Sequence, residues 1–162
     1  MRRLPLLALL ALVLATPAFA LPGAEEDGSL SVKRGRGYVG LRFDGAVLGR
    51  VAHGSVRISD PLSTDGLGPE FFGCDYQRDV NDTTTYCSGD DIRFRAFGGK
   101  YSVRVKGRGI FVSAVGHGKV MLDGRGDETD RPDGVYSFND ADYESLPDDP
   151  RQFVLAAPSA GG

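Results

Sequence analysis

The chain has no tryptophan, and it contains only two cysteines, two histidines and two methionines. Structural zinc sites are built from four Cys and His ligands, and a catalytic zinc usually has three protein ligands, so two histidines suffice only if an aspartate joins them. The sequence also lacks Gly-x-Ser-x-Gly, His-Glu-x-x-His, a phosphate-binding glycine loop and a dinucleotide fingerprint. No enzyme or cofactor class is therefore indicated by a motif.

Apolar residues at helical spacing are missing as well, because no stretch of 11 or more positions after residue 20 shows them. Short alternating runs separated by glycines recur instead. They predict an all-β fold, a single antiparallel β-sandwich or barrel-like domain of about 8–10 short strands over residues 21–157. The expected strands are 29–34, 38–43, 46–52, 55–59, 92–97, 101–106, 110–115, 119–122, 135–138 and 152–156. Long loops are expected at 60–91 and 123–133, and a flexible tail at 158–162.

Residues 1–20 have the pattern of a cleavable signal peptide. Arg2 and Arg3 precede an apolar run over 4–15, and the small residues Ala18 and Ala20 suit a cleavage site. A membrane anchor needs about 20 apolar residues, which this run does not reach. We therefore expect a secreted, periplasmic or cell-envelope protein with no membrane span in the mature chain.

The two cysteines, Cys74 and Cys87, flank a polar loop. In an oxidising compartment two such thiols are expected to form a disulfide. The formal net charge of the whole chain is −3, so the protein is mildly acidic.

Two β-hairpins are predicted from turn chemistry. Gly98 and Gly99 supply the positive φ angles of a two-residue turn, and His53 with Gly54 suggests a second one. Counting outward from these turns pairs Ala96 with Tyr101, Phe94 with Val103, and Val51 with Val56. The same count places arginine opposite arginine, pairing Arg93 with Arg104 and Arg50 with Arg57, so each pair must splay or hold an anion.

The first hairpin has a polar outer face rich in cations. Its basic residues are Arg93, Arg95, Arg104 and Lys106, with Arg108 close by. Such a face is suited to an anionic partner such as an envelope polymer, unless the acidic loops fold over it. The leading hypothesis is therefore a non-enzymatic exported domain with a binding or structural role at the envelope or outside the cell.

Two segments of the chain resemble two later ones: 31–37 resembles 102–109, and 51–56 resembles 115–120. The resemblance suggests an internal repeat, and it gives His53 and His117 matching positions. If the two histidines share a cleft with a carboxylate, the alternative function is a secreted hydrolase with His/Asp acid–base groups. If they do not, each histidine simply sits at a turn.

Calcium is a further candidate ligand, because it prefers the oxygen ligands that the two long loops contain. Neither loop has the spacing of a known calcium motif, so no cofactor is expected from the pattern. The candidate residues are Asp75, Asp79, Asn81, Asp82, Asp90 and Asp91 in the first loop, and Asp123, Asp127, Glu128, Asp130 and Asp133 in the second.

Overall fold

A computed structural model describes residues 26–62, 68–125 and 134–158. Its strands are β1 Gly28–Ser59, β2 Glu70–Phe72, β3 Tyr76–Asn81, β4 Thr84–Arg125, β5 Val135–Phe138, β6 Glu144–Ser145 and β7 Arg151–Leu155. They form one antiparallel sheet of seven strands that is not closed, and the all-β prediction is confirmed. No helix in these ranges has the length and apolar character needed to cross a membrane. The predicted signal peptide lies outside the described residues.

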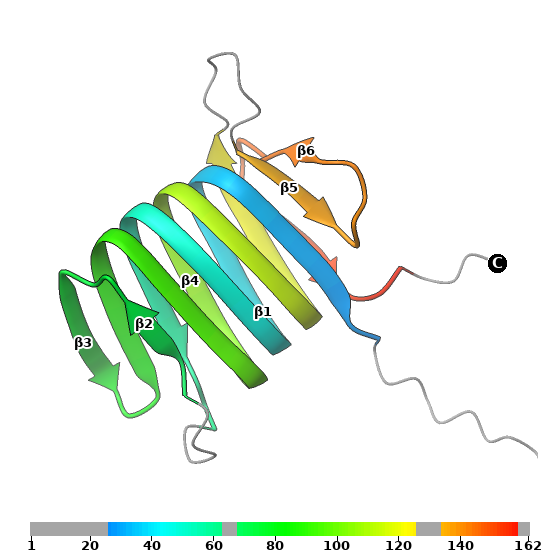
Figure 1. The fold of residues 1–162 in the computed structure, drawn as a ribbon. Coiled ribbons are helices and arrows are strands. Elements are labelled where there is room, and N and C mark those ends of the chain that lie inside the picture. Colours follow the sequence, from blue (N-terminus) through cyan, green and yellow to red (C-terminus); the bar gives the residue numbers. More distant parts are fainter. Residues whose placement is uncertain (1–25, 63–67, 126–133, 159–162) are drawn as a thin grey trace, which may run out of the picture.

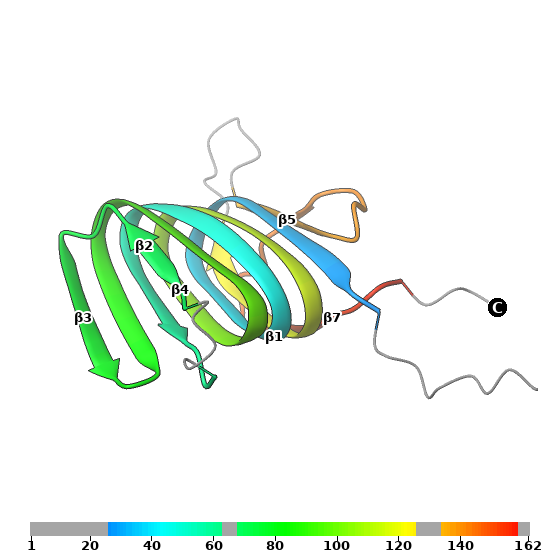
Figure 2. The ribbon, with the colours of Figure 1, turned by 60° about the horizontal axis from the view of Figure 1, so that its bottom comes forward.

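Two unusually long strands, β1 of 32 residues and β4 of 42, build most of the molecule. Much of β1 has a segment of β4 on each side: Leu41 pairs with both Val103 and Val120, and Val56 with both Cys87 and Val105. The β4 partners of one β1 residue are thus 17 or 18 positions apart, which means that the two strands wind together as a coil. Figures 1 and 2 show their segments alternating along it.

Glycines occupy the two edges at which the coil folds over its core. At one edge Gly45 pairs with Gly99 and Gly116; at the other, Gly54 pairs with Gly89 and Gly107, and Gly37 with Gly107 and Gly124. At Gly107 φ is +154°, and an added Cβ would lie 2.2 Å from the carbonyl oxygen of His53. A side chain at this position would collide with the neighbouring backbone, so the close passage requires glycine.

The glycine edges divide the coil into two layers. The near layer, which faces the viewer in Figure 1, contains 28–36, 46–53, 90–98 and 108–115; the far layer contains 38–44, 55–59, 84–88, 100–106 and 117–123. The strands β2 and β5 extend the near layer, whereas β3 and β7 extend the far one. Each near-layer segment, of eight or nine residues, spans about 28 Å, since a strand rises about 3.3 Å per residue.

Alternating residues of both layers point inward and form one hydrophobic core. Val39, Leu41, Val51, Ile92 and Val103 are examples that are fully or almost fully buried. Because side chains on a strand alternate between its two sides, the residues between them point outward and form the two outer faces of the molecule.

The predicted hairpins at Gly98–Gly99 and His53–Gly54 are wrong. All eight strands expected between 29 and 122 lie within strand residues, but four belong to β1 and four to β4. The chain bends at each glycine and continues. Gly45 pairs with Gly99 and Val47 with Ala96, so β4 has one extra residue there, and Gly98 with φ of +71° forms a β-bulge instead of a turn.

The corrected register exchanges the partners of the arginines. Arg50 lies opposite Arg93 on the near layer, and Arg57 lies opposite Arg104 on the far layer. The sequence therefore correctly predicts that arginine lies opposite arginine, but it predicts the wrong pairs. The reason is that β1 lies between segments of β4 and does not pair with itself.

The region expected as a long loop, 60–91, also contains strands. It holds β2, β3 and the start of β4, with Tyr76 pairing with Ser88 and Gln77 with Cys87. The predicted disulfide between Cys74 and Cys87 is present, and Cys87 is completely buried. The disulfide fastens the segment between β2 and β3 to β4 at the core.

We predict that Gly107→Ala destabilises the folded protein by more than about 2 kcal/mol, because it combines an unfavourable φ with a backbone clash. Gly98→Ala has the φ penalty alone, since no atom lies within 4 Å of its added Cβ. Gly98→Ala should therefore lower the free energy of unfolding by about 1 kcal/mol. Urea unfolding of both variants measures the difference, and equal losses would contradict the close passage at the edge.

We also predict that reducing the Cys74–Cys87 disulfide lowers the free energy of unfolding by about 3 kcal/mol, the value expected for a closed loop of this size. Alkylation of the unreduced, denatured protein should modify no thiol. Two modified cysteines per chain would show that the disulfide does not form.

Candidate functional site

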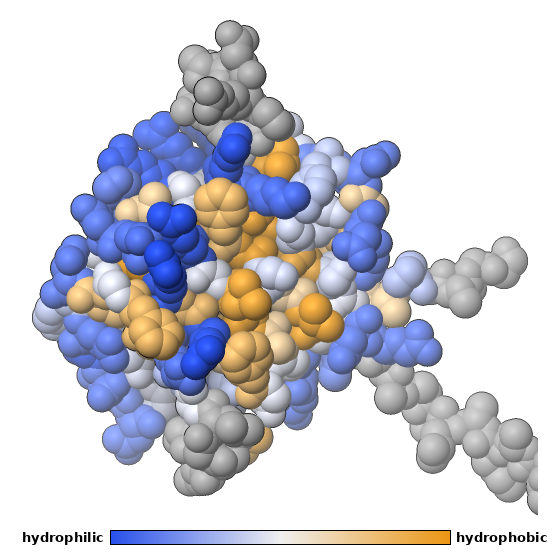
Figure 3. Space-filling model, viewed as in Figure 1, coloured by the Kyte–Doolittle hydropathy of each residue, from blue (hydrophilic) through white to orange (hydrophobic). Residues whose placement is uncertain are grey.

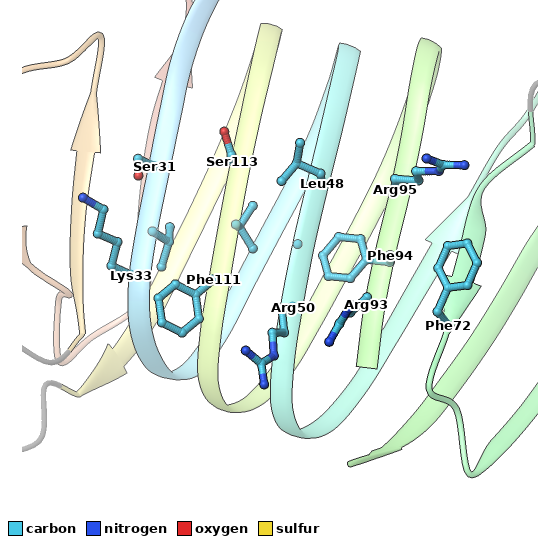
Figure 4. Close-up of a pocket in the computed structure, with 13 residues that line it drawn as sticks. Ser31, Lys33, Leu48, Arg50, Phe72, Arg93, Phe94, Arg95, Phe111 and Ser113 are labelled. Carbon is cyan, nitrogen blue, oxygen red and sulfur yellow. The ribbon is translucent and has the colours of Figure 1, made fainter. Parts of the chain in front are cut away.

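An open groove of about 660 Å³ runs over the outer face of the near layer. Its outward side chains come from β1, β2 and β4, which bring residues far apart in the sequence side by side (Figure 4). They are Ser31, Lys33, Leu48, Arg50, Phe72, Arg93, Arg95, Phe111 and Ser113. We call this surface the groove.

The register of the sheet sets the groove residues in two rows that cross the strands. One row runs Ser31, Ser113, Leu48, Arg95 and Glu70, and the other runs Phe111, Arg50, Arg93 and Phe72. The small serines at one end of the first row leave space above the sheet, whereas the larger phenylalanine rings of the second row project from the sheet next to that space. The depression follows from this contrast in side-chain size.

The groove exposes apolar side chains that a solvated sheet face normally lacks. Leu48, Phe72 and Phe111 are 54%, 52% and 39% exposed, respectively. In Figure 3, apolar patches alternate with strongly polar ones on this side of the molecule. Exposed apolar patches rimmed by polar groups mark binding surfaces.

Two carboxylates pair with the three arginines of the groove. Asp91 accepts hydrogen bonds from Arg50 and, at 3.4 Å, from Arg93. Arg50, chiefly through its hydrogen bond, and Arg93 hold the pKa of Asp91 below its ordinary value. Glu70 accepts from Nε and Nη2 of Arg95 at 3.1 and 2.7 Å. The rim therefore presents hydrogen-bond donors and acceptors together.

Aromatic contacts hold other polar groups of the rim. The guanidinium carbon of Arg95 lies 5.9 Å from the ring centroid of Phe72 and 6.0 Å from that of Phe97. At the opposite end, Nζ of Lys33 lies 4.0 Å from the ring centroid of Tyr143, whose hydroxyl donates to Ser31. Lys33 and then Ser31 lower the pKa of Tyr143.

The predicted basic face of Arg93, Arg95, Arg104, Lys106 and Arg108 does not exist as one surface. Arg93 and Arg95 line the groove, whereas Arg104 and Lys106 lie on the far layer. Arg108 lies at an edge, opposite Arg36 and His53. The prediction fails because it relied on a hairpin at Gly98, where the strand in fact passes into the other layer.

The structure does not bring the two histidines together. His53 precedes Gly54 at one edge and pairs with Asp90, whereas His117 lies between Gly116 and Gly118 at the other edge, 3.0 Å from a carboxylate oxygen of Asp27. A hydrolase of the kind expected from sequence would have to use a single His–Asp pair.

Most of the predicted calcium ligands of the first loop make contacts with other protein groups. Asp75 accepts from the backbone N–H of Asp90 at 3.1 Å, and Asp79 from the hydroxyl of Thr85 at 2.8 Å. Within the described ranges, no three His, Cys, Asp or Glu side chains gather as a metal site. Asp127, Glu128, Asp130 and Asp133 lie outside those ranges.

Sequence reasoning missed Lys33, Leu48, Arg50, Phe72 and Phe111 as groove residues. A signal for two of them was present, because Leu48 and Phe111 occupy positions that the alternation directs outward, where a polar residue is usual. Nothing in the linear sequence places these two residues beside each other or beside Phe72.

We predict that Arg50→Gln raises the pKa of Asp91 toward its ordinary value, because it removes the main hydrogen-bond donor. The pKa of Asp91 is lower in the folded protein than in the unfolded one. Ionised Asp91 therefore stabilises the folded protein at pH values above its ordinary pKa, and this contribution is lost as the pH falls through the folded pKa. Carbon NMR of the carboxyl group measures the titration. Arg95→Gln is the control and should leave Asp91 unchanged; an unshifted Asp91 in Arg50→Gln would refute the contact.

Comparison with known proteins adds no relative from which a role could be transferred. The chain matches no protein-family model, no curated protein and no solved structure.

Proposed function

We propose that the protein is an exported binding domain that holds a polysaccharide chain in the groove. The observation that carries the proposal is the combination of exposed rings at Phe72 and Phe111 with hydrogen-bond donors and acceptors along one open depression. A mostly apolar concave site with a few convergent polar groups is the usual form of a ligand site.

The two rings suit flat ligand units that repeat. Phe111 and Phe72 are separated by three inter-strand steps, through Arg50 and Arg93, or about 14 Å at 4.8 Å per step. Sugar rings present apolar C–H faces that pack on aromatic rings and bury area there. A chain of such units laid across the strands would contact both phenylalanines.

The polar rim suits hydroxyl groups. Arg50, Arg93 and Arg95 supply N–H donors, while Asp91 and Glu70 supply oxygen acceptors. A sugar hydroxyl both donates and accepts, so it satisfies either kind of partner. A neutral polysaccharide carries no charge for the arginines to attract, so its binding in the groove should depend little on salt.

The proposed location follows from two features. The first 20 residues carry the pattern of an export signal, and the disulfide between Cys74 and Cys87 is of the kind that persists in oxidising compartments. An exported domain meets polysaccharides at the cell envelope and beyond it.

We predict that Phe72→Ala together with Phe111→Ala weakens polysaccharide binding at least about tenfold, because two ring contacts are lost. Affinity electrophoresis through hydroxyethyl cellulose, soluble starch, xylan and glycol chitin measures the association constants. Tyr76→Ala is the control, because Tyr76 is an exposed ring on β3 of the far layer and does not line the groove.

Retardation of the wild type by at least one of these polymers, kept in 0.5 M salt and lost in the double variant, is the expected result. A wild type that passes unretarded through all four gels contradicts the proposal. So does a double variant that binds as tightly as the wild type.

A further inference from the structure

The outer face of the far layer gathers cations from three strands. Arg42 and Arg57 come from β1, Arg78 from β3, and Arg104, Lys106 and Lys119 from β4. All six are exposed or half-buried. We call this surface the basic face; it shares only Arg104 and Lys106 with the face expected from the sequence.

The register places several of these cations directly against one another. Arg42 lies opposite Lys119, and Arg57 lies opposite Arg104. Like charges directly opposite on a sheet are destabilising. The fold therefore tolerates a repulsion that an anion lying between the two side chains of a pair would relieve.

The basic face differs from the groove in its ion pairs. In the part of the chain that the structure describes, none of the six cations forms an ion pair, whereas Arg50, Arg93 and Arg95 all do. Among the outward strand positions of the far layer, the acidic residues are Asp44 at an edge and Asp123 beside Tyr38. A protein of negative net charge thus concentrates unpaired positive charge on one side.

A row of cations crosses this layer in a line. Arg104 pairs with Arg57, Arg57 with Tyr86, and Tyr86 with Arg78, which gives a line of about 14 Å over three inter-strand steps. Arg57 and Arg78 lie 5.8 and 5.9 Å from the ring centroid of Tyr86. The Tyr86 ring lies between the two guanidinium groups and contacts both of them, so the row has no gap at this position.

We propose that the basic face binds a flexible linear polyanion, a polymer with a repeated phosphate or carboxylate group. An extended chain matches the row of cations, and its anionic groups complement the opposed pairs. Single-stranded nucleic acid fits less well, because bases need open aromatic faces on which to stack. Tyr86 contacts two guanidinium groups and Tyr38 lies against Gly40, which leaves Tyr76, 54% exposed, as the tyrosine of this face that is open to a base.

The test compares polyphosphate and polygalacturonate, which separate phosphate from carboxylate recognition, in titrations of the full mature chain at 50 and 200 mM salt. Binding to either polymer should weaken strongly with salt, by roughly a thousandfold if all six cations engage a densely charged chain. Arg57→Ser with Arg104→Ser should weaken binding at least tenfold.

Arg36→Ser with Arg108→Ser is the matched control, because these arginines also lie opposite each other but at an edge outside the basic face. It removes the same charge and should change the affinity less than twofold. The Arg57/Arg104 variant should unfold at a urea concentration no lower than that of the wild type, since a repulsion is removed, so lost binding cannot be ascribed to unfolding.

No binding of either polymer to the wild type at 50 mM salt would overturn the proposal, and so would equal losses in the two double variants. Tighter binding to single-stranded DNA or to anionic phospholipid vesicles at equal charge would assign the face to another partner. This test of the basic face is independent of the groove, because the binding of neutral polymers in the groove is expected to persist at high salt concentration.

Discussion

At each edge of the coil two backbones pass so closely that a side chain on either would strike the other. Gly45 and Gly116 face each other in this way at one edge, and Gly54 and Gly107 do so at the other. Because glycine also tolerates the positive φ of these bends, β1 and β4 can each continue through several folds without a turn. The core, the two layers and both outer faces depend on this passage.

The coil also explains how one small sheet carries two chemically distinct faces. Each long strand crosses an edge and emerges on the other layer, so near neighbours in the sequence such as Arg95 and Arg104 point to opposite sides. On the near layer Asp91 and Glu70 pair with the arginines of the groove, which also has exposed rings. Among the described residues, no carboxylate pairs with the six cations of the basic face, which separates a site suited to hydroxyl groups from one suited to anions.

Local alternation was sufficient to predict which segments form strands, but not which segments pair with each other. The segments around Val39, Val51, Val103 and Val120 alternate apolar and polar residues, and this pattern depends only on neighbours along the chain. Pairing depends on whether glycine reverses the chain or bends it. Of the two glycines at the expected hairpin, only Gly98 has a positive φ, and the composition of the segment does not reveal this difference. The groove was missed for the same reason, because Phe72, Arg50 and Phe111 become neighbours only through the register.

The most direct test of the coil is a set of inter-strand nuclear Overhauser contacts measured around Leu41 in the folded protein. The coil predicts that the backbone of this segment contacts two separate segments of β4, around Val103 and around Val120. Contacts from the Val103 segment to the segment of Phe94, with none from Leu41 to Val120, would restore the hairpin at Gly98 and contradict the coil.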